Sequence, residues 1–142
     1  MSDGFDLERF VKAQDGVYER ACAELRVGQK RTHWMWFIFP QIRGLGSSSM
    51  AVWFGIASLA EAKAYLEHAV LGTRLRECAG IVCGVEGKTA SEIFGYPDDL
   101  KFHSSMTLFA KAAEANEMDE VFGEALEKYF DGEMDGGTLE RI

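Results

Sequence analysis

Basic, aromatic and amide side chains are concentrated in one segment of the chain, from Lys30 to Ser47. This segment holds Trp34 and Trp36, two of the three tryptophans, with polar side chains before and after them. Apolar walls with a few convergent polar groups are typical of a preformed ligand pocket. The candidate ligand-binding residues of the segment are Lys30, Arg31, Trp34, Trp36, Gln41, Arg43 and Ser47.

Arg31 and Arg43 are the residues of this segment best suited to bind an anion. A guanidinium donates paired hydrogen bonds to a carboxylate or a phosphate, so the two arginines would clamp such a group. The glycine- and serine-rich loop at 44–49 would present backbone N–H groups to the same anion. That loop lacks the spacing of a phosphate-binding P-loop or of a dinucleotide-binding fingerprint, so nucleotide binding does not follow from it.

The tryptophans and the histidine of the segment suggest two further roles. Trp34 or Trp36 would stack on a planar group of the ligand. His33 is a candidate catalytic residue, because an imidazole donates or accepts a proton near neutral pH. The alternative interpretation is a buried core segment, from Trp34 to Phe39, whose basic ends are solvated.

A second polar cluster lies between Asp98 and Ser105. Asp98 and Asp99 are candidate catalytic carboxylates for the hydrolysis of a glycosidic or phosphate bond, although two acids at a helix start also suit capping and the helix dipole. Hydroxyls inside a helix lower its propensity, so Ser104 and Ser105 are expected to hydrogen-bond another group. Lys101 shares a helical face with both serines, and these three residues are candidate ligand-binding residues.

We expect His33, Arg43 and the segment Asp98–Ser105 to surround one cavity. Both segments combine rigid apolar packing with polar groups that have little local purpose. The expected ligand is a small anion, such as a phosphate-bearing metabolite or a nucleotide, and the enzyme version of this hypothesis is a hydrolase. Whether the protein is an enzyme stays open. The alternative is a non-enzymatic interaction module, in which the basic strip Arg26–Arg43 docks an acidic partner or a second copy of the chain.

The charge of the chain is acidic overall but unevenly distributed. In 142 residues, 15 Lys and Arg face 23 Asp and Glu, and the net charge is −8. This balance argues against general binding of nucleic acid or of an anionic membrane. No acid occurs between Glu24 and Glu61, whereas the basic residues of that interval are Arg26, Lys30, Arg31 and Arg43.

Cysteine usage and the N-terminus bear on location and on metal binding. The three cysteines are Cys22, Cys78 and Cys83, without a Cys-x-x-Cys pair. This pattern is typical of reduced thiols in a cytosol, and it predicts neither a metal site nor a cofactor. The N-terminus is acidic and lacks the features of a secretory signal, and no long apolar run is present. We therefore expect a cytoplasmic protein without a membrane segment.

Hydrophobic spacing and capping residues predict the elements that must position these groups. Apolar residues recur at helical intervals over most of the chain, and no alternating strand pattern competes. Only the Trp34–Phe39 run is open to either helix or strand. We expect an all-α, single multihelical domain over residues 1–142, with about six helices and loop-rich connections. The predicted helices are Asp6–Leu25, one starting at Ser58, one around 71–82 joined or broken at Gly72, a short one after Thr89, Leu100–Ala115 and Val121–Phe130.

Three further local expectations follow from these elements. Ser58 and Thr89 each begin a capping box, and the serines at 47–49 would cap a helix that starts near Met50. The three tryptophans lie close together in sequence and have very large side chains. We therefore expect at least two of Trp34, Trp36 and Trp53 to be buried in the core.

The same segments resemble the bacterial and fungal domain of unknown function 1810 family. The resemblance rests on motifs spread over nearly the whole chain: Phe10–Gln14, Lys30–Gln41, Gly44–Gly46, Tyr65–Leu66, Leu71–Leu75 and Asp98–Phe109. It implies a small, soluble, multihelical protein with no established activity, cofactor or catalytic residue. Some members of the family carry a calpastatin label, but 12% aromatic residues and two prolines describe a packed domain and not a disordered inhibitor.

Overall fold

A computed structural model describes residues 5–114 and 119–142, and its regular structure is helical apart from one isolated β-bridge in that part of the chain. Six of its ten helices have seven residues or more, so the prediction of an all-α fold with about six helices is confirmed for the described residues. None of these helices is long and apolar enough to cross a membrane. The helices are α1 (Glu8–Gln14), α2 (Tyr18–Val27), α3 (Met35–Ile38), α4 (Ser49–Trp53), α5 (Leu59–Glu67), α6 (Leu71–Cys83), α7 (Ala90–Phe94), α8 (Asp98–Ala112), α9 (Val121–Phe130) and α10 (Gly136–Leu139).

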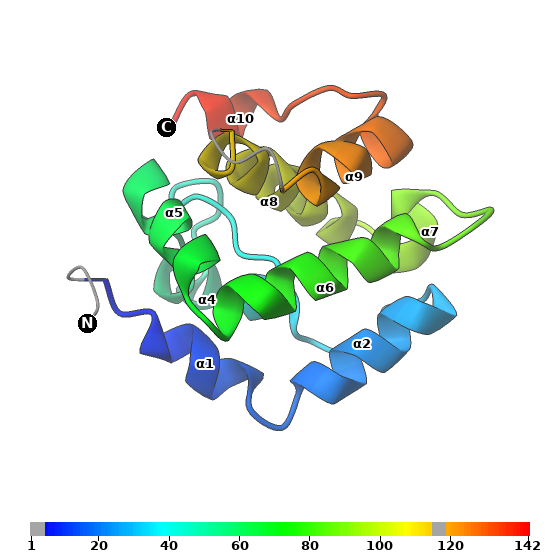
Figure 1. The fold of residues 1–142 in the computed structure, drawn as a ribbon, viewed down its shortest axis with the longest axis horizontal. Coiled ribbons are helices and arrows are strands. Elements are labelled where there is room, and N and C mark those ends of the chain that lie inside the picture. Colours follow the sequence, from blue (N-terminus) through cyan, green and yellow to red (C-terminus); the bar gives the residue numbers. More distant parts are fainter. Residues whose placement is uncertain (1–4, 115–118) are drawn as a thin grey trace.

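Helix α8 is the centre of the packing. It contacts α5, α7, α9 and α10, and every side chain from Ser104 to Phe109 is buried. In Figure 1, α6 crosses the middle of the molecule, with α9 and α10 on one side and α1 and α2 on the other. Phe102 of α8 packs against Phe94 and Phe39, with ring centroids 4.6 and 5.0 Å away. A helical segment that is covered on all sides, as residues 104–109 are, needs apolar or hydrogen-bonded side chains on every face.

The predicted single helix Asp6–Leu25 is wrong, because the chain turns sharply between α1 and α2. Gly16 adopts a left-handed φ of 79°, and Asp15 is extended. The turn allows Gln14, at the end of α1, to point into the core. Its buried amide donates to the Phe37 carbonyl at 2.8 Å and to the Tyr65 hydroxyl at 3.1 Å. The hydrophobic spacing over Asp6–Leu25 fits α1 and α2 separately, and these tertiary hydrogen bonds favour the turn between them over one continuous helix.

The predicted N-caps are confirmed, but the capping box predicted at Ser58 is only half formed, because the Glu61 carboxylate binds Ala57 and Arg9 and does not return to the Ser58 N–H. Ser48 precedes α4 and its hydroxyl accepts from the Ala51 N–H at 3.1 Å, while Ser58 precedes α5 and accepts from the Glu61 N–H at 3.2 Å. Thr89 and the third residue of α7 form a complete capping box. Each contact joins residues three apart in sequence, so sequence alone is sufficient to predict it.

The predicted helix ends are correct for Val121–Phe130, and α8 begins two residues before the predicted start. The predicted end at Ala115 lies outside the described residues. Gly72 does not interrupt α6 but lies in its first turn. A Cβ at this position would come within 2.1 Å of the Leu66 carbonyl oxygen, so the close approach of α5 requires glycine there.

The tryptophan-rich run forms the short helix α3, which settles the choice between helix and strand. Trp34 is fully buried and Trp36 is partly buried, but Trp53 is 56% exposed. The prediction that at least two tryptophans are buried is therefore wrong. Trp53 belongs to α4, a surface helix with no buried residue, and its backbone carbonyl is used in the packing while its indole is left in solvent.

Glu24, near the end of α2, holds the turn that leads into α3. Its buried carboxylate accepts from the Trp34 indole N–H at 2.9 Å, from the Arg31 N–H at 2.7 Å and from Thr32 through both N–H and hydroxyl. Burial opposes the charge, but the hydrogen bonds from Arg31, Thr32 and Trp34 outweigh it and lower the pKa of Glu24 to about 2. The ionised carboxylate thereby fixes Trp34 in the core.

We expect Glu24→Gln to lower the free energy of unfolding at neutral pH by about 2 kcal/mol, because an amide NH2 faces donors where the carboxylate accepted. A carboxyl whose pKa is lowered by folding adds stability above its unfolded pKa and loses it as pH falls. The difference between wild type and variant should therefore narrow between about pH 5 and pH 2. Urea unfolding of both proteins at several pH values measures this difference in the free energy of unfolding.

Glu19→Gln, which neutralises an exposed acid of the same helix, is the matched control and should change stability little. A Glu24→Gln variant that is as stable as Glu19→Gln at neutral pH would contradict the role of Glu24.

Candidate functional site

A cavity of about 560 Å³ lies where the 36–51 segment meets the N-terminal half of α8 and the segment around α10. We call it the Trp36 cavity. Five of the candidate ligand-binding residues predicted from sequence contribute to its walls although they come from distant segments. These five are Trp36, Gln41, Ser47, Lys101 and Ser104. The other lining residues are Leu45, Gly46, Ser48, Ala51, Pro97, Leu100, Asp135 and Gly137.

One wall of the Trp36 cavity belongs to a loop that is closed at its neck. Ile42 and Ile56 form a parallel bridge, in which the Arg43 N–H donates to the Ile56 carbonyl at 2.8 Å and the Ile56 N–H to the Gln41 carbonyl at 2.9 Å. Both isoleucines are buried. The bridge fixes the backbone of Gln41 and defines residues 43–55 as one excursion, which we call the 43–55 loop.

A second wall consists of α8 and the C-terminal segment that it holds. The Ser104 hydroxyl donates to Asp135 Oδ2 at 3.0 Å, and the Thr107 hydroxyl accepts from the Asp135 N–H at 2.9 Å. Asp135 also caps α10 by accepting from the Thr138 N–H at 3.1 Å. Burial opposes ionisation, but the hydrogen bonds from Thr138 and Ser104 hold the pKa of Asp135 below its usual value. The Ser104 and Thr107 hydroxyls thus bind the C-terminal segment, as expected of Ser104, whereas the hydrogen bond expected of Ser105 is not formed in the described part of the chain.

Asp135 was not predicted from the sequence as a site residue. The signal that could have found it is local, because an Asp three residues before Thr138 and followed by two glycines is typical of a helix N-cap. Its proximity to Ser104 depends on the tertiary fold.

Two lysines and one aspartate form an ion-pair cluster at the start of α8. Asp98 lies 2.9 Å from Lys30 Nζ and 3.1 Å from Lys101 Nζ. Burial opposes the charge of Asp98, but the two ammonium groups lower its pKa. Asp98 is therefore held as a carboxylate, which is unsuited to the role of a general acid. Lys30 is almost fully buried by this pairing, whereas Lys101 lines the Trp36 cavity.

The indole of Trp36, which lines the cavity, carries an unused hydrogen-bond donor. Its indole Nε1 is buried and has no hydrogen-bond partner among the described residues. Lys101 Nζ lies over the same ring, 5.2 Å from its centroid. A buried N–H without an acceptor costs about 1–3 kcal/mol, so an acceptor oxygen at this point would be stabilising. Asp99 Oδ1 and the Ser105 hydroxyl are likewise buried without a partner in the described part of the chain, but neither residue lines this cavity.

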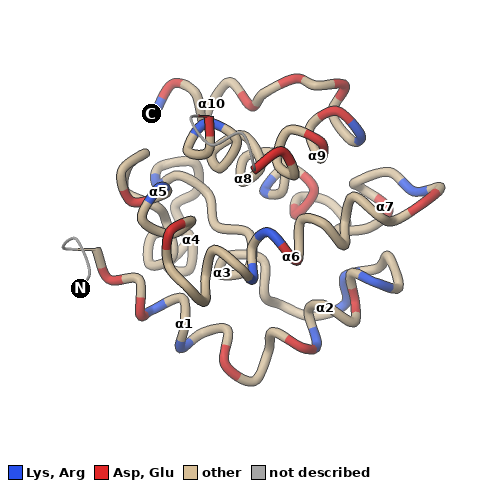
Figure 2. The backbone as a smooth tube through the Cα atoms, viewed as in Figure 1, with Lys and Arg blue, Asp and Glu red and all other residues tan. Residues whose placement is uncertain are grey.

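The structure does not bring His33, Arg31 and Arg43 to the Trp36 cavity. His33 and Arg31 are exposed, and Arg31 bonds Gln29 at 3.1 Å. The indole N–H of Trp34 already donates to the Glu24 carboxylate. The two-arginine clamp is therefore not assembled at this cavity. Figure 2 shows Lys and Arg spread over several helices and loops, interspersed with Asp and Glu.

Arg43 lines a different cavity, of about 460 Å³, on the other side of α4. One of its guanidinium N–H groups donates to the Gly55 carbonyl at 3.2 Å, and no described acid forms an ion pair with it. Arg43 is exposed and so remains a solvated cation at the base of the 43–55 loop. The lining residues of this cavity are Phe5, Asp6, Arg9, Arg43, Val52, Trp53, Ala57 and Glu61.

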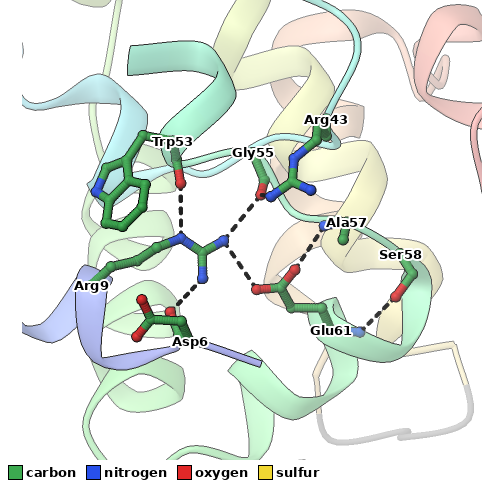
Figure 3. A network of polar contacts seen from close by, with 8 residues as sticks. All are labelled: Asp6, Arg9, Arg43, Trp53, Gly55, Ala57, Ser58 and Glu61. Atoms are coloured by element: carbon green, nitrogen blue, oxygen red, sulfur yellow. Dashed lines mark hydrogen bonds and ion pairs between the residues drawn. The ribbon is translucent and has the colours of Figure 1, made fainter. Parts of the chain in front are cut away.

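A buried ion pair between Arg9 and Glu61 forms the floor of the second cavity (Figure 3). The Arg9 guanidinium donates to Glu61 at 3.1 Å, to the Trp53 carbonyl at 2.8 Å and to the Gly55 carbonyl at 3.0 Å. The other oxygen of Glu61 accepts from the Ala57 N–H at 2.7 Å. Arg9 thus ties α1 to the end of the 43–55 loop. This pair was not predicted from the sequence, because its members are far apart in the chain.

Metal binding has no support in the described residues, among which no three His, Cys, Asp or Glu side chains are grouped to hold an ion. The residues that line the Trp36 cavity instead carry an indole N–H, an ammonium, an amide, hydroxyls and the Asp135 carboxylate. These groups suit hydrogen bonding to a ligand.

Comparison with known proteins gives a family and a fold. Residues 4–142 match the family model described as a protein of unknown function, DUF1810. The chain is also similar to the crystal structure of the conserved hypothetical protein Rv1873 from Mycobacterium tuberculosis, with 56% sequence identity and a TM-score of 0.94. That similarity covers 99% of this chain and 98% of the other. No curated protein matches the chain.

The Arg9–Glu61 pair predicts strong coupling between two distant helices. We expect Arg9→Met to lower the free energy of unfolding by about 3 kcal/mol, because it leaves a buried carboxylate without its counter-charge. Adding Glu61→Gln to this variant should cost less than Glu61→Gln costs in the wild type. Urea unfolding of the two single variants and the double variant measures the coupling.

Arg43→Met removes an exposed arginine of the same network and serves as the control, with an expected cost below about 1 kcal/mol. Equal costs for the Arg9 and Arg43 variants, or strict additivity in the cycle, would show that the ion pair does not join α1 to α5.

Proposed function

The chain belongs to the DUF1810 family, for which no function is described, and from the geometry of its site we propose that it binds a small anionic molecule in the Trp36 cavity. The observation that supports this most directly is the unpaired donor of Trp36 beside the ammonium of Lys101. An oxygen that carries negative charge would pair with the Lys101 ammonium, next to an indole N–H that lacks an acceptor. The ligand class we infer is a small carboxylate or a phosphate-bearing metabolite.

The charge at the start of α8, beside the Trp36 cavity, supports an anion. Two ammonium groups, those of Lys30 and Lys101, face the single carboxylate of Asp98, and of these three residues Lys101 lines the cavity. The acid that lines the cavity, Asp135, is engaged by hydroxyl and N–H donors. An anionic group of the ligand would therefore complete the charge balance around Lys101 without displacing Asp98 from Lys30.

The remaining walls support a ligand with an apolar or planar part. Leu45, Pro97 and Leu100 line the cavity beside the Trp36 ring, while the amide of Gln41 and the hydroxyl of Ser47 offer hydrogen bonds. A volume of about 560 Å³ lies within the range of cavities that take metabolites. A nucleotide-like molecule combines an anionic and a planar part in this way.

The geometry supports binding more than hydrolysis. Asp98 is tied to two lysines, and Asp99 does not line the cavity. His33, the candidate acid–base residue, is exposed away from it. A hydrolytic reaction needs a group that exchanges a proton with the substrate, and none of these three residues is placed for it.

The interaction-module alternative is less well supported. It needs the strip Arg26–Arg43 to present its cations on one face, but Lys30 is buried and paired with Asp98. Arg43 lies at the base of the 43–55 loop, and Arg31 bonds Gln29. The basic residues of the strip are therefore close in sequence, but they do not form one basic surface.

Thermal-shift titrations with phosphate, pyrophosphate, nucleotides and ADP-ribose test the proposal. We expect at least one of these anions to raise the melting temperature in a saturable way, because a ligand that binds the folded state stabilises it. Lys101→Ala and Trp36→Phe should each weaken that ligand about ten-fold or more, since each removes a hydrogen bond to a charged group worth roughly 1.5–3 kcal/mol.

Trp36→Phe keeps an aromatic ring and removes only the N–H donor, so it separates hydrogen bonding from packing. Lys12→Ala, at an exposed lysine of α1, controls for general charge effects and should leave the affinity unchanged. The absence of a saturable shift with every anion, or equal weakening by all three variants, would refute binding in the Trp36 cavity.

A further inference from the structure

Two cysteines from neighbouring helices meet in the core on the side of the molecule away from the α8 site. Cys22 of α2 and Cys78 of α6 place their Sγ atoms 3.9 Å apart. Both side chains are almost fully buried, with exposures of 2% and 1%. We propose that Cys22 and Cys78 form a redox-modification site, at which a peroxide converts the two thiols into an intramolecular disulfide that links α2 to α6.

The geometry is close to that of a disulfide. An S–S bond is about 2.05 Å long, so the two sulfurs have to approach by roughly 2 Å, which small changes in the side-chain torsions share between them. Helices α2 and α6 pack directly against each other. The backbone therefore already holds the two cysteines next to each other across the contact between α2 and α6.

The contacts of Cys22 make it the more reactive of the two thiols. The hydrogen bond from Cys78 lowers its pKa, burial opposes this, and the Tyr18 hydroxyl lowers it further, to about 7. The thiolate is the nucleophile, so the lowered pKa makes Cys22 the attacking thiol of the pair. The pKa of Cys78 is raised, because its proton bonds the Cys22 sulfur and its site is buried.

Tyr18 links the pair to the surface. It lies one turn before Cys22 on α2, is partly buried, and its hydroxyl donates to the exposed carboxylate of Glu77. Because Cys22 is only 2% exposed, hydrogen peroxide reaches its sulfur through local opening of α2.

The reaction proceeds in two balanced steps. The Cys22 thiolate attacks one oxygen of hydrogen peroxide, the O–O bond breaks, and the hydroxide that leaves takes up a proton to become water, so that Cys22 carries a sulfenic acid. The Cys78 sulfur then attacks the Cys22 sulfur, the S–O bond breaks, and the oxygen leaves with the Cys78 proton as a second water. Two thiols are oxidised to one disulfide and one peroxide is reduced to two waters.

Cys83 is a matched control within the same helix. Its thiol donates to the Val121 carbonyl at 3.8 Å, and burial raises its pKa. Its Sγ is not within hydrogen-bond distance of another described thiol. The chain thus contains one cysteine that should remain a thiol under the conditions that oxidise the other two.

The test treats the full-length protein with hydrogen peroxide, unfolds it, alkylates it with N-ethylmaleimide and measures the intact mass. The reduced protein has three cysteines and takes three maleimides, whereas the oxidised protein should take one and lose two hydrogens. Peptide mapping should link the peptides of Cys22 and Cys78. The link closes a long loop, so the melting temperature of the oxidised protein should rise by about 5 °C.

Variants assign the bond. Cys83→Ser should still form the disulfide and then take no maleimide, while Cys22→Ala and Cys78→Ala should form no intramolecular disulfide. Mapping of the wild type decides the question even if the core variants fold poorly. Three maleimides on the treated wild type, or a link that involves Cys83, would overturn the proposal, and neither result bears on ligand binding in the Trp36 cavity.

Discussion

The carboxylate of Glu24 is the interaction on which the route of the chain depends. It collects donors from Arg31, Thr32 and Trp34 and so turns the chain from α2 into the core. Once Trp34 is fixed, α3 and the aromatic cluster around Phe102 follow, and α8 is enclosed. A buried charge is tolerated here because each oxygen is satisfied by N–H or O–H donors, without a cationic partner.

Glu61 has the corresponding role at the other end of the interval that contains no acid. It binds Arg9, whose guanidinium also holds the end of the 43–55 loop (Figure 3). Two buried acids thus anchor both ends of the segment that carries most of the candidate ligand-binding residues. Since no acid lies between them in sequence, a cation of this segment that forms an ion pair does so with a distant element, as Lys30 does with Asp98, whereas Arg43 remains in solvent.

The Trp36 cavity is a consequence of how these anchored parts meet. The bridge between Ile42 and Ile56 closes the 43–55 loop, and the hydroxyls of α8 hold the C-terminal segment through Asp135. Both walls are therefore set by backbone and buried polar contacts, and the polar groups between them are left with unused hydrogen-bonding capacity at Trp36. Such preorganisation reduces the ordering that a ligand would otherwise have to induce.

The sequence by itself determined the helical class, the caps at Ser58 and Thr89, and helix Val121–Phe130, because these depend on hydrogen bonds and apolar spacing within a few residues. It also indicated both polar segments whose residues share the Trp36 cavity. Only the tertiary structure decided the break at Gly16, the exposure of Trp53, and the partners of Lys30, Arg9 and Ser104. Those features depend on contacts between residues far apart in the chain, for which local periodicity contains no information.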